Sequence, residues 1–217
     1  MRKPNKTEMQ ALVRELRAIA PKRPLTYGES LQVGRIQAAR LRRWANAVEP
    51  DINLIWLVKQ RLIPVNFVAS HKLGEESGLT TDQVSGRLEM FVNEGEPPVR
   101  QRFSLLHEWK HALDFDDAPI LHAKLGRGNA KVQAGQIEAI CNDFAAHVLM
   151  PTALVKREWF TWQELSVVAN IFNVSVEAIA TRLEKLGILG EPKPAPRFYF
   201  RRSLLPDVQQ DDFALAA

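Results

Sequence analysis

Two histidines four residues apart, the first followed directly by a glutamate, restrict the fold of this chain more than any other feature. They form His107-Glu108-Trp109-Lys110-His111, in a stretch of good helix formers that follows a β-rich region. On a helix, positions four apart lie on one face with β-carbons about 6 Å apart, so both imidazoles can reach one metal ion. The fold is therefore expected to keep this segment helical and to turn this face toward an ion.

The same pattern indicates a chemistry. Zinc lowers the pKa of a water that it binds from near 16 to about 7 and polarises a carbonyl group. Glu108 lies one residue round the helix, where its carboxylate can meet that water rather than the ion. We expect Glu108 to take a proton from the water and to pass it to the leaving amine. Alone, the motif remains a hypothesis, because two histidines can also lie on a helix surface without a role.

A third ligand is predicted on a second helix, at about residues 134–150. Glu138 borders its apolar face, where an unpaired carboxylate would be costly to bury; coordination to zinc would remove that cost, although a simple salt bridge is the alternative. Asn142, one turn further on, could accept the second N–H of a ligating histidine. The apolar face consists of Ile137, Ile140, Cys141, Phe144, Val148 and Leu149.

Two segments resemble the signatures of the ImmA/IrrE zinc metallo-endopeptidases: residues 100–114, around the histidines, and residues 138–151, from Glu138 to Pro151. Residues 168–187 resemble the helix-turn-helix-like segment that follows them in that family. The resemblance covers about residues 25–190. It implies Zn²⁺ held by His107, His111 and Glu138 with Glu108 as the base. It further implies an anti-repressor protease that cleaves a partner transcriptional repressor, often one of a prophage or mobile element.

The chain departs from the family pattern at two positions. Lys110 stands where the family often has glycine, and Cys141 stands where alanine is common. Neither residue belongs to the predicted ligand set.

We expect an α+β, zincin-like fold. A small, mostly antiparallel sheet from residues 62–93 would line the cleft, with an edge strand free to pair with an extended substrate. Pro64 indicates that the first strand starts late or lies at an edge. Gly74, Gly78 and Thr80 suggest a loop between the two β-rich runs, residues 62–69 and 86–93.

Four segments are expected along the chain. Residues 1–50 form a basic helical segment, 51–160 the zinc metallopeptidase core, 161–190 a helix-turn-helix-like subdomain, and 191–217 a Pro-rich extended tail. In the subdomain, Ser175 is placed to cap the second helix and Gly187 to end it.

Charge is unevenly distributed. Residues 1–64 hold 13 Lys/Arg and 5 Asp/Glu, a net charge of +8, so the remainder of this +4 chain carries −4. Such asymmetry can mark nucleic-acid contact or a solvated helical surface, and we favour the surface. Residues 176–186 offer Arg182 and Lys185 but also Glu177 and Glu184, a poor balance for a recognition helix. Direct DNA binding is therefore not expected, and the predicted partner is a repressor-type transcription factor as protein substrate.

Two other functions remain open. One is a DNA-binding regulator in which zinc is structural, although structural zinc sites are usually closed by four ligands, often cysteines, and this chain has one cysteine. The other is a toxin–antitoxin-type or partner-binding protein that retains the fold without proteolysis. The single cysteine and the lack of a signal peptide or a long apolar run predict a cytoplasmic protein without a membrane segment. His71, His122 and His147 are given no role.

Overall fold

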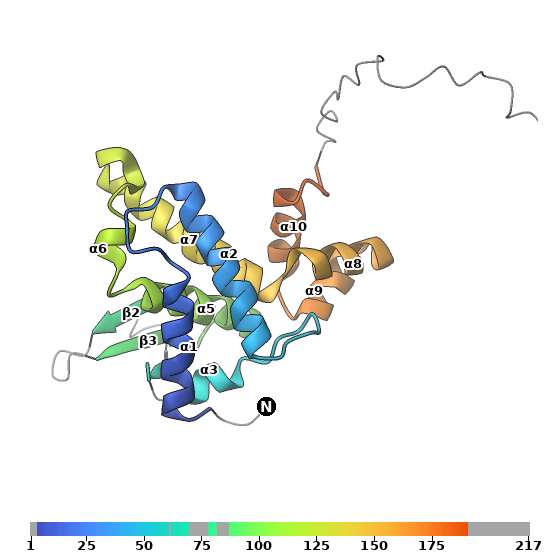
Figure 1. Ribbon diagram of the computed structural model, residues 1–217. Coiled ribbons are helices and arrows are strands. Elements are labelled where there is room, and N and C mark those ends of the chain that lie inside the picture. Colours follow the sequence, from blue (N-terminus) through green and yellow to red (C-terminus); the bar gives the residue numbers. More distant parts are fainter. Residues whose placement is uncertain (1–3, 61, 70–77, 82–86, 191–217) are drawn as a thin grey trace, which may run out of the picture.

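The structure is a computed structural model that describes residues 4–60, 62–69, 78–81 and 87–190. It has mixed α+β architecture, with helices packed beside a small sheet (Figure 1). The elements are, in chain order, α1 (Lys6–Ala18), α2 (Tyr27–Trp44), α3 (Ile55–Lys59), β1 (Val65–Val68), β2 (Gly78–Thr81), β3 (Leu88–Asn93), α5 (Pro98–Asp114), α6 (Ala118–Leu121), the 3₁₀ helix η1 (Leu125–Gly128), α7 (Ala130–Leu149), α8 (Thr152–Trp162), α9 (Leu165–Phe172) and α10 (Val176–Lys185).

The sheet is mixed, so the prediction of a mostly antiparallel sheet was wrong. Its strand order is β1-β3-β2. β3 pairs with β1 in parallel, Val65 opposite Met90, and with β2 in antiparallel fashion, Gly78 opposite Phe91. The cause is β2, which the sequence prediction treated as part of a loop. Because the chain reverses once into β2 and again into β3, β1 and β3 run in the same direction.

The strand limits agree with the turn-forming residues around them. β1 starts at Val65, directly after Pro64, and it lies at one edge of the sheet, as expected for a residue that lacks a backbone donor. β2 forms the opposite edge. Gly74 and His71, which the sequence analysis also considered, lie outside the described residues.

The helices that carry the motif residues start where local signals place them. α5 has Pro98 in its first turn, a position where the missing N–H costs nothing. Asn129 caps α7, because its side chain accepts a hydrogen bond from the backbone N–H of Val132. Pro151 follows α7 and directly precedes α8, a helix that the sequence analysis did not predict.

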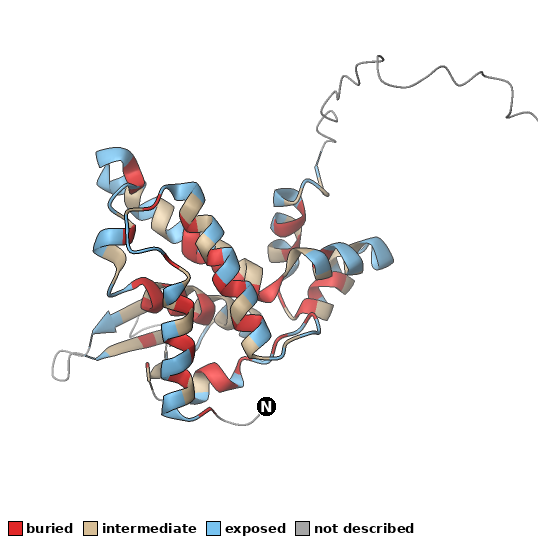
Figure 2. Cartoon of the chain, in the orientation of Figure 1, coloured by how far each residue is buried: buried red, intermediate tan, exposed pale blue. Residues whose placement is uncertain are grey.

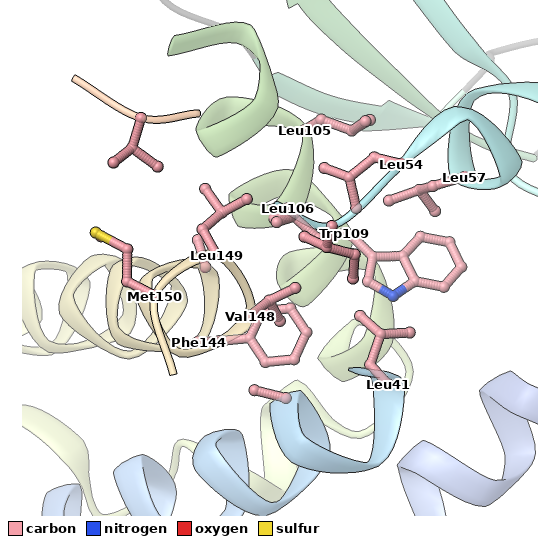
Figure 3. Close-up of a cluster of buried hydrophobic side chains, with 14 of the residues drawn as sticks. Leu41, Leu54, Leu57, Leu105, Leu106, Trp109, Phe144, Val148, Leu149 and Met150 are labelled. Carbon is pink, nitrogen blue, oxygen red and sulfur yellow. The ribbon is translucent and has the colours of Figure 1, made fainter. Parts of the chain in front are cut away.

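The main apolar core joins α2, α5 and α7. Buried residues gather where these helices pack together (Figure 2). Leu41 of α2, Trp109 of α5 and Phe144 of α7 are fully buried there (Figure 3). Burial of one such side chain stabilises the fold by roughly 1.5–3 kcal/mol. Because α5 packs against α7 in this core, the packing also determines the separation between the two histidines on α5 and Glu138 on α7.

The C-terminal helices connect to the end of α7. Arg182 of α10 donates hydrogen bonds to the backbone oxygen of Met150 and to Thr152. Ser175 caps α10 through the N–H of Ala178, and Gly187 follows the helix with a φ of 69°, as the sequence predicted. The division into four segments stays a prediction, and residues 191–217 lie outside the described residues.

Within the residues that the structure describes, no helix combines the length and apolar character needed to span a bilayer.

Candidate metal centre

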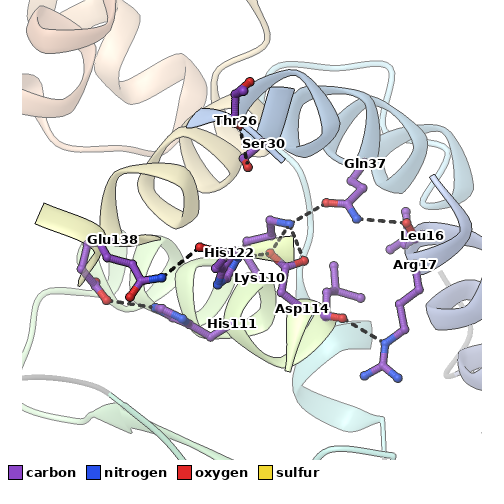
Figure 4. Close-up of polar contacts among 12 residues, drawn as sticks. Leu16, Arg17, Thr26, Ser30, Gln37, Lys110, His111, Asp114, His122 and Glu138 are labelled. Carbon is purple, nitrogen blue, oxygen red and sulfur yellow. Dashed lines mark hydrogen bonds and ion pairs between the residues drawn. The ribbon is translucent and has the colours of Figure 1, made fainter. Parts of the chain in front are cut away.

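Three side chains from two helices converge on one point. His107 and His111 lie one turn apart on α5, and their Nε2 atoms are 3.1 Å apart. Glu138 reaches them from α7, with Oε2 3.1 Å from Nε2 of His107 and Oε1 3.4 Å from Nε2 of His111 (Figure 4). Among the described residues, these three form the group of acidic, histidine or cysteine side chains with donor atoms close enough to share an ion.

Asn142 determines which nitrogen of His107 can bind a metal. Its Oδ1 lies 2.8 Å from Nδ1 of His107. An amide oxygen can only accept, so Nδ1 carries the proton and Nε2 keeps its lone pair. That lone pair is on the atom that faces His111 and Glu138.

The separations of these donor atoms suit zinc. In a tetrahedral zinc site with bonds of about 2.0–2.1 Å, neighbouring ligand atoms lie about 3.3 Å apart. Here the two Nε2 atoms are 3.1 Å apart, and the two oxygens of Glu138 lie 3.1 Å from His107 and 3.4 Å from His111, one oxygen to each ring. Two imidazoles and one carboxylate are also a donor set of catalytic rather than structural zinc sites. The residues present therefore fit a zinc ion with one position left for water or substrate.

Electrostatics favours the state of His111 that can ligate. Burial lowers the pKa of His111, and the neighbouring His107 lowers it further, against the opposing charges of Glu138 and Asp114. A neutral imidazole is the form that offers a lone pair to a metal.

The cluster opens into a cleft of about 780 Å³. Glu108 lines this cleft beside the two histidines and is 6% exposed. Gly78 and Leu79 of the edge strand β2 also line it. The cleft thus brings the predicted base, the predicted ligands and a strand edge to one place.

Glu138 differs from the sequence analysis in one respect. Its side chain is 55% exposed, so the argument from the cost of burying a lone carboxylate does not apply. Its position is explained instead by its approach to the two imidazoles.

A buried polar network lies behind the cleft, and the sequence analysis missed it. Lys110 is 2% exposed and donates hydrogen bonds to both oxygens of Asp114, at 2.6 and 2.7 Å, and to Gln37 of α2, at 2.9 Å (Figure 4). Gln37 in turn donates to the backbone oxygen of Leu16 in α1. Lys110 and Asp114 are four residues apart on one helix face, a spacing that indicates an ion pair.

His122, which the sequence analysis gave no role, also lines the cleft. Its Nε2 lies 3.6 Å from Oδ2 of Asp114. Its charge is among those that lower the pKa of His111. The residue follows α6 at a chain reversal, so no periodic pattern in the sequence could have placed it here.

His147, to which the sequence analysis gave no role, lies outside the cleft. Its Nδ1 is 2.8 Å from the backbone oxygen of Asp143 and 3.3 Å from the carboxylate of the same residue. Arg35 of α2 donates to that carboxylate as well. Burial alone would raise the pKa of Asp143, but the hydrogen bonds from His147 and Arg35 outweigh it and lower the pKa to about 2.

Cys141 is buried, as expected for a small packed residue. Burial raises the pKa of its thiol well above the usual value, so the reactive thiolate is disfavoured.

Several positive charges of residues 1–64 are balanced by the acidic remainder of the chain. Arg17 pairs with Asp116 at 2.5 Å and Lys22 with Asp117 at 2.6 Å, while Arg35 pairs with Asp143 at 2.9 Å. These pairs reduce the free positive charge that the N-terminal half could present to DNA.

A family model described as the IrrE N-terminal-like domain of the M78 peptidases matches residues 67–184. This is more than half of the 217 residues, and it includes all three side chains of the cluster. The chain belongs to this family. Membership of the M78 peptidases implies a metallopeptidase in general, and the resemblance to the ImmA/IrrE proteins is confirmed.

Among solved structures, a Mycobacterium tuberculosis transcriptional regulator is similar to this M78 chain, with a TM-score of 0.55 and 17% sequence identity. The match covers 80% of this chain and 51% of the regulator, so the chain spans about half the length of that protein. At this identity the likeness concerns the fold alone. No curated protein matches the chain.

Proposed function

We propose that this M78 protein is a zinc-dependent endopeptidase that cleaves a partner transcriptional repressor in the cytoplasm. The repressor is one encoded by a prophage or mobile element. His107, His111 and Glu138 hold the ion, and Glu108 is the general base. The observation that carries the proposal is the convergence of His107, His111 and Glu138. The two Nε2 atoms are 3.1 Å apart and one carboxylate oxygen of Glu138 lies near each, at 3.1 and 3.4 Å, beside a buried glutamate in an open cleft.

Each residue has a defined part in this proposal. The ion, when bound, supplies a more acidic water and polarises the scissile carbonyl. Glu108 accepts the proton of that water and delivers it to the leaving amine. Asn142 holds the ring of His107 with its lone pair toward the ion, at 2.8 Å.

The cleft supports an extended peptide as substrate. β2 pairs with β3 on one side and forms an edge of the sheet, while Gly78 and Leu79 line the cleft. An extended segment can add to a strand edge through main-chain hydrogen bonds. A repressor would have to present its cleaved segment in this extended form.

The test compares the wild-type chain with Glu108→Gln. We expect both proteins to bind about one zinc per chain, measured by elemental analysis after loading and desalting. The glutamine variant is expected to lose cleavage of the repressor-like protein encoded nearest to this gene, scored as fragments on co-expression, because an amide cannot accept the proton. Glu158→Gln, a change on α8 outside the cleft, serves as the matched control and should cleave like the wild type.

The results separate the competing functions. A wild-type protein that refuses freshly supplied zinc at neutral pH would exclude the peptidase. Equal fragment formation by wild type and Glu108→Gln would show that Glu108 is not the base. Retention on DNA that falls steeply with salt, together with no cleavage, would favour the DNA-binding alternative.

A further inference from the structure

Among the described residues that line the cleft, His122 is a histidine that the proposed ligand set does not use. His122 follows α6 rather than lying on either ligand helix, and its side chain is only 11% exposed. It nevertheless lines the same cleft as His107, His111 and Glu108. A ring in this position faces the space that a peptide in the cleft would occupy.

We propose that His122 donates a hydrogen bond to the oxygen of the scissile carbonyl group, with Asp114 as the residue that positions its ring. This inference rests on the proposed peptidase function, and it adds the group that stabilises negative charge on that oxygen.

The contacts of Asp114 fix its carboxylate, which can therefore orient the ring of His122. Its carboxylate is 9% exposed and accepts two short hydrogen bonds from Lys110, and Oδ2 also faces Nε2 of His122 at 3.6 Å. A carboxylate accepts but cannot donate, so the two groups attract each other as an ion pair when the ring of His122 is protonated. In the protonated ring the second nitrogen is a donor too, and this is the one available to the substrate.

The support for Asp114 extends away from the cleft. Lys110 donates to Gln37 of α2, and Gln37 donates to the oxygen of Leu16 in α1. Each partner in this series is buried and hydrogen-bonded (Figure 4). Burying an ion pair generally stabilises a fold no better than apolar side chains of the same volume. The ion pair of Lys110 and Asp114 is therefore better explained by its effect on the orientation of His122 than by its contribution to stability.

Other polar side chains of the cleft are less suited to this task. Asn142 is engaged by His107. Arg100 has a side chain that is 72% exposed and paired with Glu96, so water screens it strongly. A donor acts on developing charge most strongly when it is pre-oriented and shielded from water, and His122 meets both conditions.

The experiment measures binding of two synthetic probes to the zinc-loaded full chain by calorimetry. The first is a phosphinic dipeptide, whose phosphinyl oxygens imitate the charged oxygen of the tetrahedral state. The second is a mercaptoacyl dipeptide with the same side chains, which binds zinc through sulfur and offers no such oxygen. The variants are His122→Leu, His122→Gln, which keeps a donor, and the double variant Lys110→Met with Asp114→Leu, which replaces the ion pair by apolar groups.

We expect His122→Leu to weaken the phosphinic probe by about 10–100-fold and the mercaptoacyl probe by less than about 2-fold. His122→Gln should recover part of the loss, and the double variant should behave like His122→Leu. The control His147→Leu, on α7 outside the cleft, should bind both probes like the wild type. Unchanged zinc content and melting temperature would show that the losses are local.

Two results would overturn the inference while leaving the peptidase in place: phosphinic binding by His122→Leu equal to that of the wild type, or equal weakening of both probes. If the double variant does not fold, the comparison of His122→Leu with His122→Gln decides. A zinc-loaded wild type that binds neither probe would overturn the proposed function itself, and this inference with it.

Discussion

His107 is held from two sides, by the pair His111 and Glu138 at one ring nitrogen and by Asn142 at the other. The side chain of Glu138 is 55% exposed and can adjust to an ion, whereas the contact with Asn142 orients the ring of His107. The amide of Asn142 therefore lowers the cost of arranging the site.

Replacement of Asn142 by alanine tests this role. We expect zinc affinity to fall by about 10–100-fold, because the ring and its tautomer are no longer fixed. Competition with a chromophoric chelator measures the change. Asn170→Ala, at an exposed position of α9, is the matched control and should bind zinc like the wild type. Equal affinities for wild type and Asn142→Ala would contradict the role of Asn142.

At the scale of elements, the approach of α2 to the two ligand helices depends on one small residue. Gly34 is buried in α2, where an added β-carbon would lie 3.8 Å from Cβ of Phe144 in α7 and 3.9 Å from Cε of Lys110 in α5. Both are ordinary contact distances, so there is room for a methyl group and little more. Gly34 therefore limits how closely α2 approaches α5 and α7.

Substitutions at Gly34 should change stability in opposite directions. Gly34→Ala should stabilise the protein by about 0.5–1 kcal/mol, because alanine is the better helix former. Gly34→Leu should destabilise it by about 1–3 kcal/mol through overpacking. Urea unfolding followed by circular dichroism measures both.

Gly135 provides the control for these variants, since it lies in α7 with nothing within 4 Å of an added β-carbon. There, leucine should be tolerated as well as alanine. A Gly34→Leu protein as stable as Gly135→Leu would show that Gly34 does not limit the approach of α2 to α5 and α7.

At the scale of the whole molecule, the N-terminal helices are bound to the ligand helices by polar contacts as well as by the core. Arg17 donates to the backbone oxygens of Ala112 and Leu113 near the end of α5. Arg42 donates to the oxygen of Val148 near the end of α7. Cationic groups at helix C-termini satisfy free carbonyls and oppose the helix dipole. The family match begins at residue 67, but the site depends on contacts made before it.

The pair of Arg35 in α2 and Asp143 in α7 is one such contact, and its contribution to the free energy of unfolding should depend on pH. The hydrogen bonds from His147 and from Arg35 together lower the pKa of Asp143 to about 2, so Arg35 contributes part of a stabilisation that is present above the unfolded pKa of about 3.9. That stabilisation is lost as the pH falls through about 2. Arg35→Met should therefore lower the free energy of unfolding by about 1–2 kcal/mol at pH 7. The difference from wild type should shrink between pH 4 and pH 2.

Urea unfolding of metal-free protein from pH 7 to pH 2 measures this difference. Lys131→Met, in the exposed first turn of α7, is the matched control and should show no such convergence at acidic pH. A deficit of Arg35→Met that persists unchanged at pH 2 would show that the pair does not act through the charge of Asp143.

Much of the arrangement could be read from the sequence because it depends on contacts between near neighbours. The spacing of His107 and His111 places both on one face of any α-helix. The cap at Ser175 located the start of α10, and the apolar periodicity located α7 to within a few residues, although α8 was missed. Glu138 was found from its place beside an apolar helix face and from the family signature, although the cost of its burial proved to be the wrong reason.

The rest was decided by contacts between distant parts of the chain. No local sequence pattern shows that residues 78–81 form a strand that pairs with β3. Because of this strand, β1 runs parallel to β3 instead of antiparallel to it. His122 approaches Asp114 and Lys110 contacts Gln37. In both cases the two residues lie on different elements. Local patterns carry the conformation of a segment, whereas the partners of a buried charge or a strand edge depend on the packing of the entire core. For this reason the two histidines could be placed in advance, but the network behind them could not.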